Sequence, residues 1–247
     1  MNFMQANLPY LLAGISVGGQ YALIAIGYTM VYGILRLINF AHGDVFMIAG
    51  LIMVYAAASL PLYIAIPLVL VVTVVIGFLI ERVAYKPLRS APRMSVMISA
   101  IGVSYLLQNL ALYVTGGLSK MYPTIPFISD SVTIGTATTK MVTLITPVLT
   151  LVLVVVLVLF IQKTKIGMAM RAVSKDFETS QLMGIKINSV ISATFIIGSF
   201  LAAVGSLLYF TNYAGVIPTS GAMPGLKAFV AAVLGGIGSI PGAMVGG

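Results

Sequence analysis

Long apolar stretches without charge alternate with short charged stretches along the whole chain. A membrane-spanning helix needs about 20 mostly apolar residues. The uncharged stretch 45–80 is too long for one crossing of a hydrocarbon core about 30 Å thick. We expect it to fold back at Ser59-Leu60-Pro61, because proline disfavours helix in the residue before it. The pattern predicts spans at residues 8–34, 45–59, 62–80, 94–114, 141–161 and 189–211, with a further apolar segment from about 226.

Glycines interrupt the last apolar segment, at Gly235, Gly236, Gly238, Gly242 and Gly246. Small residues spaced four apart allow helices to pack closely in lipid, which is the simpler interpretation. The stretch is nevertheless too irregular for a lipid-exposed helix, and irregular backbone at membrane depth survives only when it is buried in protein or lines a cavity. We therefore expect a re-entrant segment near the C-terminus.

Basic residues are distributed unevenly between the two sides that these spans define. The stretches 81–93 and 162–188, together with Arg36, hold ten of the 13 Lys and Arg residues. Cytoplasmic loops carry an excess of Lys and Arg, so we predict that 81–93 and 162–188 are cytoplasmic and that 115–140 and 212–225 are external. The N-terminus then faces outward. Residues 1–247 form a single transmembrane domain.

The composition supports a membrane protein and excludes several chemistries. The chain is 60% hydrophobic and 7% charged, whereas a soluble domain has about 25% charged residues. It has no cysteine and one histidine, so we predict no metal site and no cysteine nucleophile. The net charge of +8 is explained by the basic loops and does not indicate nucleic-acid binding. The fold class is an all-α polytopic bundle of about 6–7 spans.

No catalytic machinery is visible in the sequence. A phosphate-binding loop is missing, because Gly225-Leu226-Lys227-Ala228 lacks the hydroxyl residue that such a loop requires. No nucleophile, base and orienting group occur together. We expect a transport subunit rather than an enzyme, with energy supplied by an ion gradient or by a partner.

The segment 36–44 concentrates polar groups between the first two apolar stretches. If it lies at membrane depth, its ionisable groups are costly and indicate a substrate pathway. Alternatively it is a cytoplasmic turn in which Asp44 caps the next helix. The candidate pathway residues are Asn39, Phe40, His42, Gly43 and Asp44.

The loop from Lys163 to Lys186 mixes apolar and charged residues, which predicts two short amphipathic helices. Ser174 or Asp176 would begin the second helix and Gly184 would end it. Such a pair either docks onto another protein or lies on the membrane surface.

Three segments, in order, resemble the permeases of high-affinity branched-chain amino acid importers, which are ABC transporters, and in particular the LivH type. The first segment is Gly27 to Ile34 followed by Asn39 to Asp44. The second is the loop residues Gly167, Arg171, Ala172, Asp176 and Gly184, which resemble that family's ATPase coupling loop. The third is Gly235 to Gly247. The resemblance covers essentially the whole chain.

This resemblance implies import of leucine, isoleucine and valine, or of related small solutes, across the bacterial cell membrane. It implies a second, LivM-like permease, two cytoplasmic ATPase subunits that use ATP and Mg²⁺, and an external solute-binding protein, with no cofactor in this chain. It favours the pathway role for 39–44 and the coupling role for the loop. Members usually continue beyond the glycine-rich motif, so we expect this chain to be short at its C-terminus.

Three alternatives remain open. A gradient-driven secondary carrier would place ionisable residues inside its spans, and outside 36–44 the predicted spans have none. A related permease specific for urea or amides is the second alternative, and a structural or assembly membrane protein without a pathway is the third.

Overall fold

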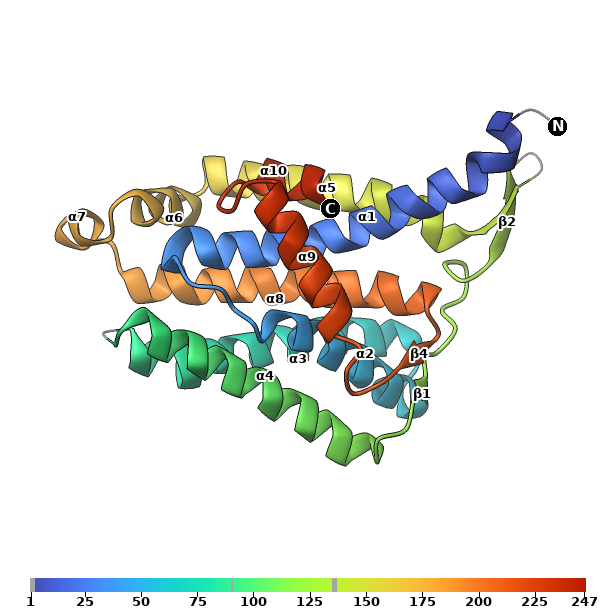
Figure 1. Ribbon diagram of the computed structural model, residues 1–247, viewed down its shortest axis with the longest axis horizontal. Helices are drawn as coiled ribbons and strands as arrows, with labels where there is room; N and C mark the ends of the chain where they lie inside the picture. Colours follow the sequence, from blue (N-terminus) through green and yellow to red (C-terminus); the bar gives the residue numbers. More distant parts are fainter. Residues whose placement is uncertain (1–2, 90, 135–136) are drawn as a thin grey trace.

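The computed structural model describes residues 3–89, 91–134 and 137–247 as a bundle of long helices (Figure 1). Six helical stretches in this part of the chain are long and apolar enough to cross a membrane. The long helices are α1 Phe3–Leu35, α2 His42–Ser59, α3 Leu62–Ile80, α4 Arg93–Thr115, α5 Met141–Lys163 and α8 Ile187–Asn212. The predicted all-α polytopic fold is confirmed.

Shorter elements connect these helices. They are the π-helix η1 Glu81–Tyr85, the 3₁₀-helix η2 Lys86–Leu88, α6 Lys165–Lys175, α7 Phe177–Leu182, α9 Ala222–Leu234 and α10 Ile240–Gly246. Strands β2 Ser131–Ile134 and β3 Ala137–Lys140 pair as an antiparallel hairpin, and β1 Lys120–Met121 pairs with β4 Gly215–Val216. Both pairs lie at the end of the bundle opposite α6 and α7 (Figure 1).

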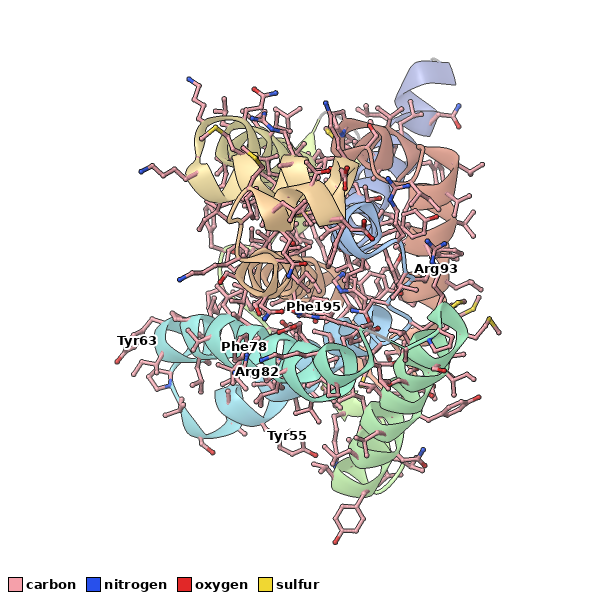
Figure 2. The ribbon with its side chains drawn as sticks, turned by 90° about the vertical axis from the view of Figure 1, so that its left-hand side faces the viewer. Tyr55, Tyr63, Phe78, Arg82, Arg93 and Phe195 are labelled. Atoms are coloured by element: carbon pink, nitrogen blue, oxygen red, sulfur yellow. The ribbon has the colours of Figure 1, made fainter. Side chains whose placement is uncertain are left out.

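The helices differ in how much of their surface is covered by protein. In their most apolar windows, 67% of α2 and 61% of α8 are buried, against 17% of α4 and 22% of α5. Viewed along the bundle, Phe195 of α8 lies near the centre, whereas Tyr55 and Tyr63 point outward (Figure 2). The inner helices α1, α2 and α8 pack on one another, and the outer ones present apolar side chains that suit lipid.

Several predicted boundaries are correct. Leu60 is extended and ends α2 directly before Pro61, as expected for a residue that precedes proline. Gly116 closes α4 in the left-handed conformation. The two basic stretches 81–93 and 162–188 lie at the same end of the bundle (Figure 1). That this end is cytoplasmic stays a prediction.

Other boundaries were wrong. The stretch 81–93 is not all loop, because helical structure continues through η1 and η2 to Leu88. The stretch 212–225 is also partly helical, since α9 already begins at Ala222. Pro224 lies in the first turn of α9, where proline is tolerated because its missing N–H has no intrahelical partner there. The predicted span 45–59 begins earlier, at His42.

The glycine-rich end forms two short helices joined by a tight turn. Helix α9 has 13 residues, about 20 Å at 1.5 Å per residue, which is too short for a core about 30 Å thick. In the turn, Gly236 and Gly238 have φ values of +91° and +98°, which only glycine adopts easily. Helix α10 then packs against α9, α1 and α5. This arrangement fits a re-entrant segment, and that the segment enters the membrane without crossing it stays a prediction.

Glycine also allows close backbone contact within this pair. A Cβ on Gly235 would collide with the backbone of Gly242, and one on Gly246 would collide with Ala231. The spacing therefore serves helix packing, as the simpler interpretation proposed.

Candidate functional site

The segment between α1 and α2 leads from the end of the bundle into its interior. Arg36, the first residue after α1, has a φ of +56°. Its guanidinium donates to the carbonyl of Ser174 in α6 at 3.0 Å. Three residues later, buried Asn39 accepts a hydrogen bond from the Tyr85 hydroxyl at 2.7 Å. The segment is thus fixed to α6 at one end and to η1 in its middle.

Asp44 lies near the middle of the membrane span. Its carboxylate accepts hydrogen bonds from Ser104 at 2.5 Å and from Gln108 at 3.0 Å, both in α4. Ser104 is the central residue of the 23-residue helix α4, so it lies roughly 16 Å from either end. Asp44 is only 2% exposed. The segment 36–44 therefore enters the bundle and is not a turn at its edge.

The capping alternative for Asp44 is also contradicted. Helix α2 begins after Ala41, and no side chain caps its first turn. The carboxylate of Asp44 instead points across to α4, where both of its oxygens have partners. Its position in the first turn still favours a negative charge, because the partial positive charge of the helix dipole lies there.

A cavity of about 430 Å³ opens beside Asp44, between α2, α4 and α9. It is close to the size of small-molecule pockets, which is about 300–1,000 Å³. A Cβ on Gly43 would lie 2.7 Å from the carbonyl oxygen of Gly221, so these glycines let the starts of α2 and α9 meet here. We call this space the Asp44 cavity. Its lining is largely apolar and comprises Tyr28, Phe40, Gly43, Asp44, Ile101, Ser104, Tyr105, Gln108, Gly221, Ala222, Gly225, Leu226 and Phe229.

Three of the five predicted pathway residues, Phe40, Gly43 and Asp44, line this cavity, and two do not. Asn39 faces Tyr85 instead. His42 is buried against α1, where its ring meets Tyr28 edge-on at 4.9 Å and lies against Gly27. Its Nε2 has no hydrogen-bond partner among the described residues.

Sequence reasoning missed Ser104 and Gln108, which complete the polar group around Asp44. Both lie inside the predicted span 94–114 and are four residues apart, so they share one helix face. Two polar side chains on one face of an apolar span indicate a polar contact with another helix, because such groups form hydrogen bonds between helices in lipid. The sequence did not reveal that the partner is Asp44.

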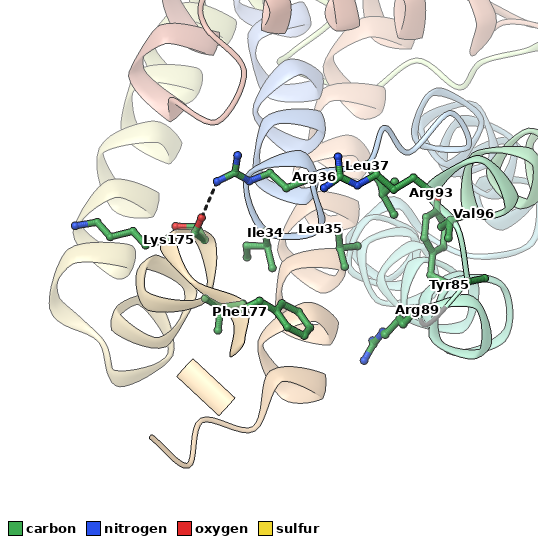
Figure 3. Close-up of a pocket in the computed structure, with 13 residues that line it drawn as sticks. Ile34, Leu35, Arg36, Leu37, Tyr85, Arg89, Arg93, Val96, Lys175 and Phe177 are labelled. Atoms are coloured by element: carbon green, nitrogen blue, oxygen red, sulfur yellow. Dashed lines mark hydrogen bonds between the residues drawn. The ribbon is translucent and has the colours of Figure 1, made fainter. Parts of the chain in front are cut away.

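A second cavity, of about 420 Å³, lies at the end of the bundle that carries α6 and α7. Figure 3 shows Arg36, Arg89, Arg93 and Lys175 around it, together with Tyr85 and Phe177. Arg89 is engaged by buried Glu81 in an ion pair and also donates to Asn188 of α8. The Ser192 hydroxyl donates to the other Glu81 oxygen at 2.8 Å. These contacts join the end of α3 to α8.

The predicted coupling loop forms two helices, α6 and α7, as the pattern indicated. Thr164 caps α6, accepting a hydrogen bond from the amide of Gly167. Asp176, not Ser174, caps α7, and its hydrogen bonds with Thr179 hold the pKa of Asp176 below its usual value.

Exposed side chains dominate the surface of this loop. Gly184, with a φ of +81°, follows α7 as predicted. Arg171 is exposed and donates weakly to the Gln162 carbonyl, while Ala172 is half-buried. Apolar side chains stand exposed beside them, namely Ile166, Met168, Phe177, Leu182 and Met183.

Chemically, the Asp44 cavity is suited to binding a small solute. Among the described residues, no three His, Cys, Asp or Glu side chains gather to hold a metal. A buried carboxylate in an apolar cavity, at the middle of a helical bundle, is typical of membrane transport proteins.

Comparisons with known proteins agree with this class. Residues 10–247 match the family described as branched-chain amino acid transport system, permease component. The high-affinity branched-chain amino acid transport system permease protein BraD of Pseudomonas aeruginosa is 43% identical over 97% of this chain and 82% of its own length. LivH of Escherichia coli K12 is 41% identical with the same coverage. The ribose import permease protein RbsC of Haemophilus influenzae is 25% identical over 91% of this chain and 70% of its own. No solved structure gives a significant match.

The chain therefore belongs to the family of branched-chain amino acid transport permeases, as its three motifs predicted. It is a multi-pass protein of the bacterial inner membrane and a transport subunit.

Proposed function

We propose that this chain forms the leucine-, isoleucine- and valine-conducting path of an ABC importer, and that the path passes through the Asp44 cavity. The observation that carries the proposal is the buried carboxylate of Asp44 at mid-depth, facing an apolar cavity of about 430 Å³. Relatives more than 40% identical are named as permeases for branched-chain amino acids. An aliphatic solute suits apolar walls, because its side chain needs no polar partner.

The energy comes from ATP hydrolysed in two separate cytoplasmic subunits. Their docking surface is the tip formed by α6 and α7, where Leu182 and Met183 are 87% and 79% exposed. Exposed apolar side chains beside charges are typical of protein interfaces. A second, similar permease subunit covers the open side of the Asp44 cavity, and an external binding protein delivers the solute.

A direct contact connects this docking surface to the segment that enters the bundle. Arg36 holds the carbonyl of Ser174 at the end of α6, and the chain reaches Asp44 eight residues later. A displacement of α6 is thereby transmitted to the start of α2. A ligand shifts the equilibrium between two positions of this segment only if it binds them with different affinity. The solute and ATP must therefore favour different positions of the segment.

The test begins with affinity purification of the chain from its native membrane and identification of the proteins that accompany it. We expect a second permease, two P-loop ATPases and a solute-binding protein. The purified complex, reconstituted in liposomes with ATP on the ATPase side, should then accumulate radiolabelled leucine. Unlabelled isoleucine and valine should compete, whereas urea and acetamide should not.

Two results would contradict the proposal. Uptake that persists without ATP and stops when a protonophore collapses the proton gradient would identify a secondary carrier. Competition by urea or acetamide, but not by valine, would assign the path to amides.

A further inference from the structure

We infer that Asp44, Ser104 and Gln108 form the recognition site for the α-ammonium group of the transported amino acid. This inference rests on the proposed function and specifies which side chains hold the solute within the Asp44 cavity.

The first argument is that the carboxylate lacks a cationic partner. Among the described residues, the only pairing of a basic side chain with a carboxylate joins Arg89 to Glu81. Asp44 is nevertheless buried at mid-depth. A buried charge without an opposite charge is expensive and is retained where it has a function. A substrate ammonium provides the missing positive charge only while the solute is bound.

The second argument is that the carboxylate has room for a ligand. A carboxylate offers about four acceptor positions on its two oxygens. Ser104 occupies one position and Gln108 another. Gln108 also donates to the Ser104 hydroxyl at 3.2 Å, which fixes the orientation of both groups. All three side chains line the same cavity, so a ligand in it lies beside the carboxylate.

The third argument is the chemistry of the surrounding wall. Around the carboxylate lie apolar and aromatic side chains from three helices, including Ile101, Leu226 and Phe229. One anionic group within a largely apolar wall matches a solute with one ammonium and an aliphatic side chain. A neutral solute such as urea or a sugar would leave the charge of Asp44 uncompensated.

A purely structural role would make different demands. Asp44 also links α2 to α4 through these two hydrogen bonds, so its contacts alone fit a strut between helices. A strut does not need a negative charge, since a neutral amide can link the same two side chains at a lower desolvation cost, with its oxygen accepting from Gln108 and its NH2 group donating to the Ser104 hydroxyl. The variant Asp44→Asn separates the two roles. It keeps the size of the side chain and an oxygen that accepts from Gln108, its NH2 group can donate to the Ser104 hydroxyl in place of the lost acceptor, and the negative charge is removed.

The experiment uses the complete reconstituted complex and three variants of this chain. Asp44→Asn removes the charge, and Ser104→Ala removes one helix-linking hydrogen bond but keeps the charge. Asp130→Asn is the matched control, because Asp130 is an exposed residue outside the cavity. Leucine uptake and the ATP hydrolysis that the binding protein stimulates are measured for each.

We expect Asp44→Asn to reduce leucine uptake at least about tenfold, the size expected for losing a charge-assisted hydrogen bond. A tenfold loss corresponds to about 1.4 kcal/mol. Stimulated ATP hydrolysis should stay within about twofold of the wild type, because α2 and α4 remain linked in this variant. Ser104→Ala should reduce uptake less than Asp44→Asn, and Asp130→Asn should behave as the wild type.

Three outcomes would overturn the inference. These are uptake by Asp44→Asn within twofold of the wild type, equal loss in Asp44→Asn and Ser104→Ala, and loss of ATP hydrolysis together with uptake in Asp44→Asn. The last two indicate a strut. Failure of the wild-type complex to take up leucine would instead refute the proposed function, so the two failures are distinguishable.

Discussion

The ion pair between Glu81 and Arg89 gives the sharpest stability prediction. Glu81 is fully buried, whereas the Arg89 side chain is 18% exposed. Removing one member of a buried pair costs about 3–5 kcal/mol, because the other charge stays buried without compensation. For Arg89→Leu we expect about 3 kcal/mol, the lower end, since Ser192 still donates to Glu81.

This loss should be visible as a lower melting temperature. For a chain of this size, 1 kcal/mol corresponds to about 2–4 °C, so Arg89→Leu should melt about 6–12 °C below the wild type. The chain has no tryptophan and no cysteine, so neither tryptophan fluorescence nor a thiol-reactive dye reports unfolding. Far-ultraviolet circular dichroism of the detergent-purified protein follows the loss of helix directly.

Two further variants decide whether this reasoning holds. The double variant Glu81→Leu with Arg89→Leu removes both charges and should recover to within about 1 kcal/mol of the wild type. Arg82→Leu is the control, because Arg82 is exposed on the same helical segment. The reasoning is refuted if Arg89→Leu melts like Arg82→Leu, or if the double variant is less stable than the single one.

Three further predictions concern the loop and the segment attached to it. Arg36→Gly relieves the strain of the left-handed backbone but removes the hydrogen bond to Ser174. We expect normal assembly of the complex, with the leucine taken up per ATP hydrolysed reduced severalfold. An unchanged ratio of leucine to ATP would show that this contact does not transmit the movement of α6. Arg171→Glu should leave membrane insertion intact and abolish the stimulation of ATP hydrolysis in the reconstituted complex, and normal stimulation would exclude Arg171 from the docking surface. The lowered pKa of Asp176 means that its cap stabilises α7 above the unfolded-state pKa of about 3.9 and is lost as the pH falls through the folded-state pKa. The hydrogen-exchange rate of the α7 amides, corrected for the intrinsic effect of pH, should therefore stay constant from pH 8 to 6 and rise only in strong acid. In Asp176→Ala these amides should exchange fast at every pH. A rise in the wild-type rate already between pH 7 and 6 would contradict this prediction.

The sequence by itself determined the features that depend on local composition. Apolar stretches of sufficient length define spans, because lipid cannot satisfy unpaired backbone groups and a helix must satisfy them internally. The break before Pro61 and the left-handed Gly184 also follow from neighbouring residues alone. For the cap of α7 the sequence offered Ser174 or Asp176, and the structure selects Asp176. The sequence also identified the segment from Asn39 to Asp44 as a concentration of polar groups, and Asn39, His42 and Asp44 are buried in the bundle. That this segment forms a substrate pathway stays a prediction.

Only the tertiary structure decided what those groups contact. Asp44 bonds Ser104 across 60 residues of sequence, and His42 turns away toward Gly27 while Asp44 faces the cavity. Lipid tails are as apolar as leucine, so a side chain that faces lipid and one that faces another helix look alike in the sequence. Which helix faces meet is settled by close packing at small residues and by the hydrogen bonds of the few polar side chains, and both need the whole bundle.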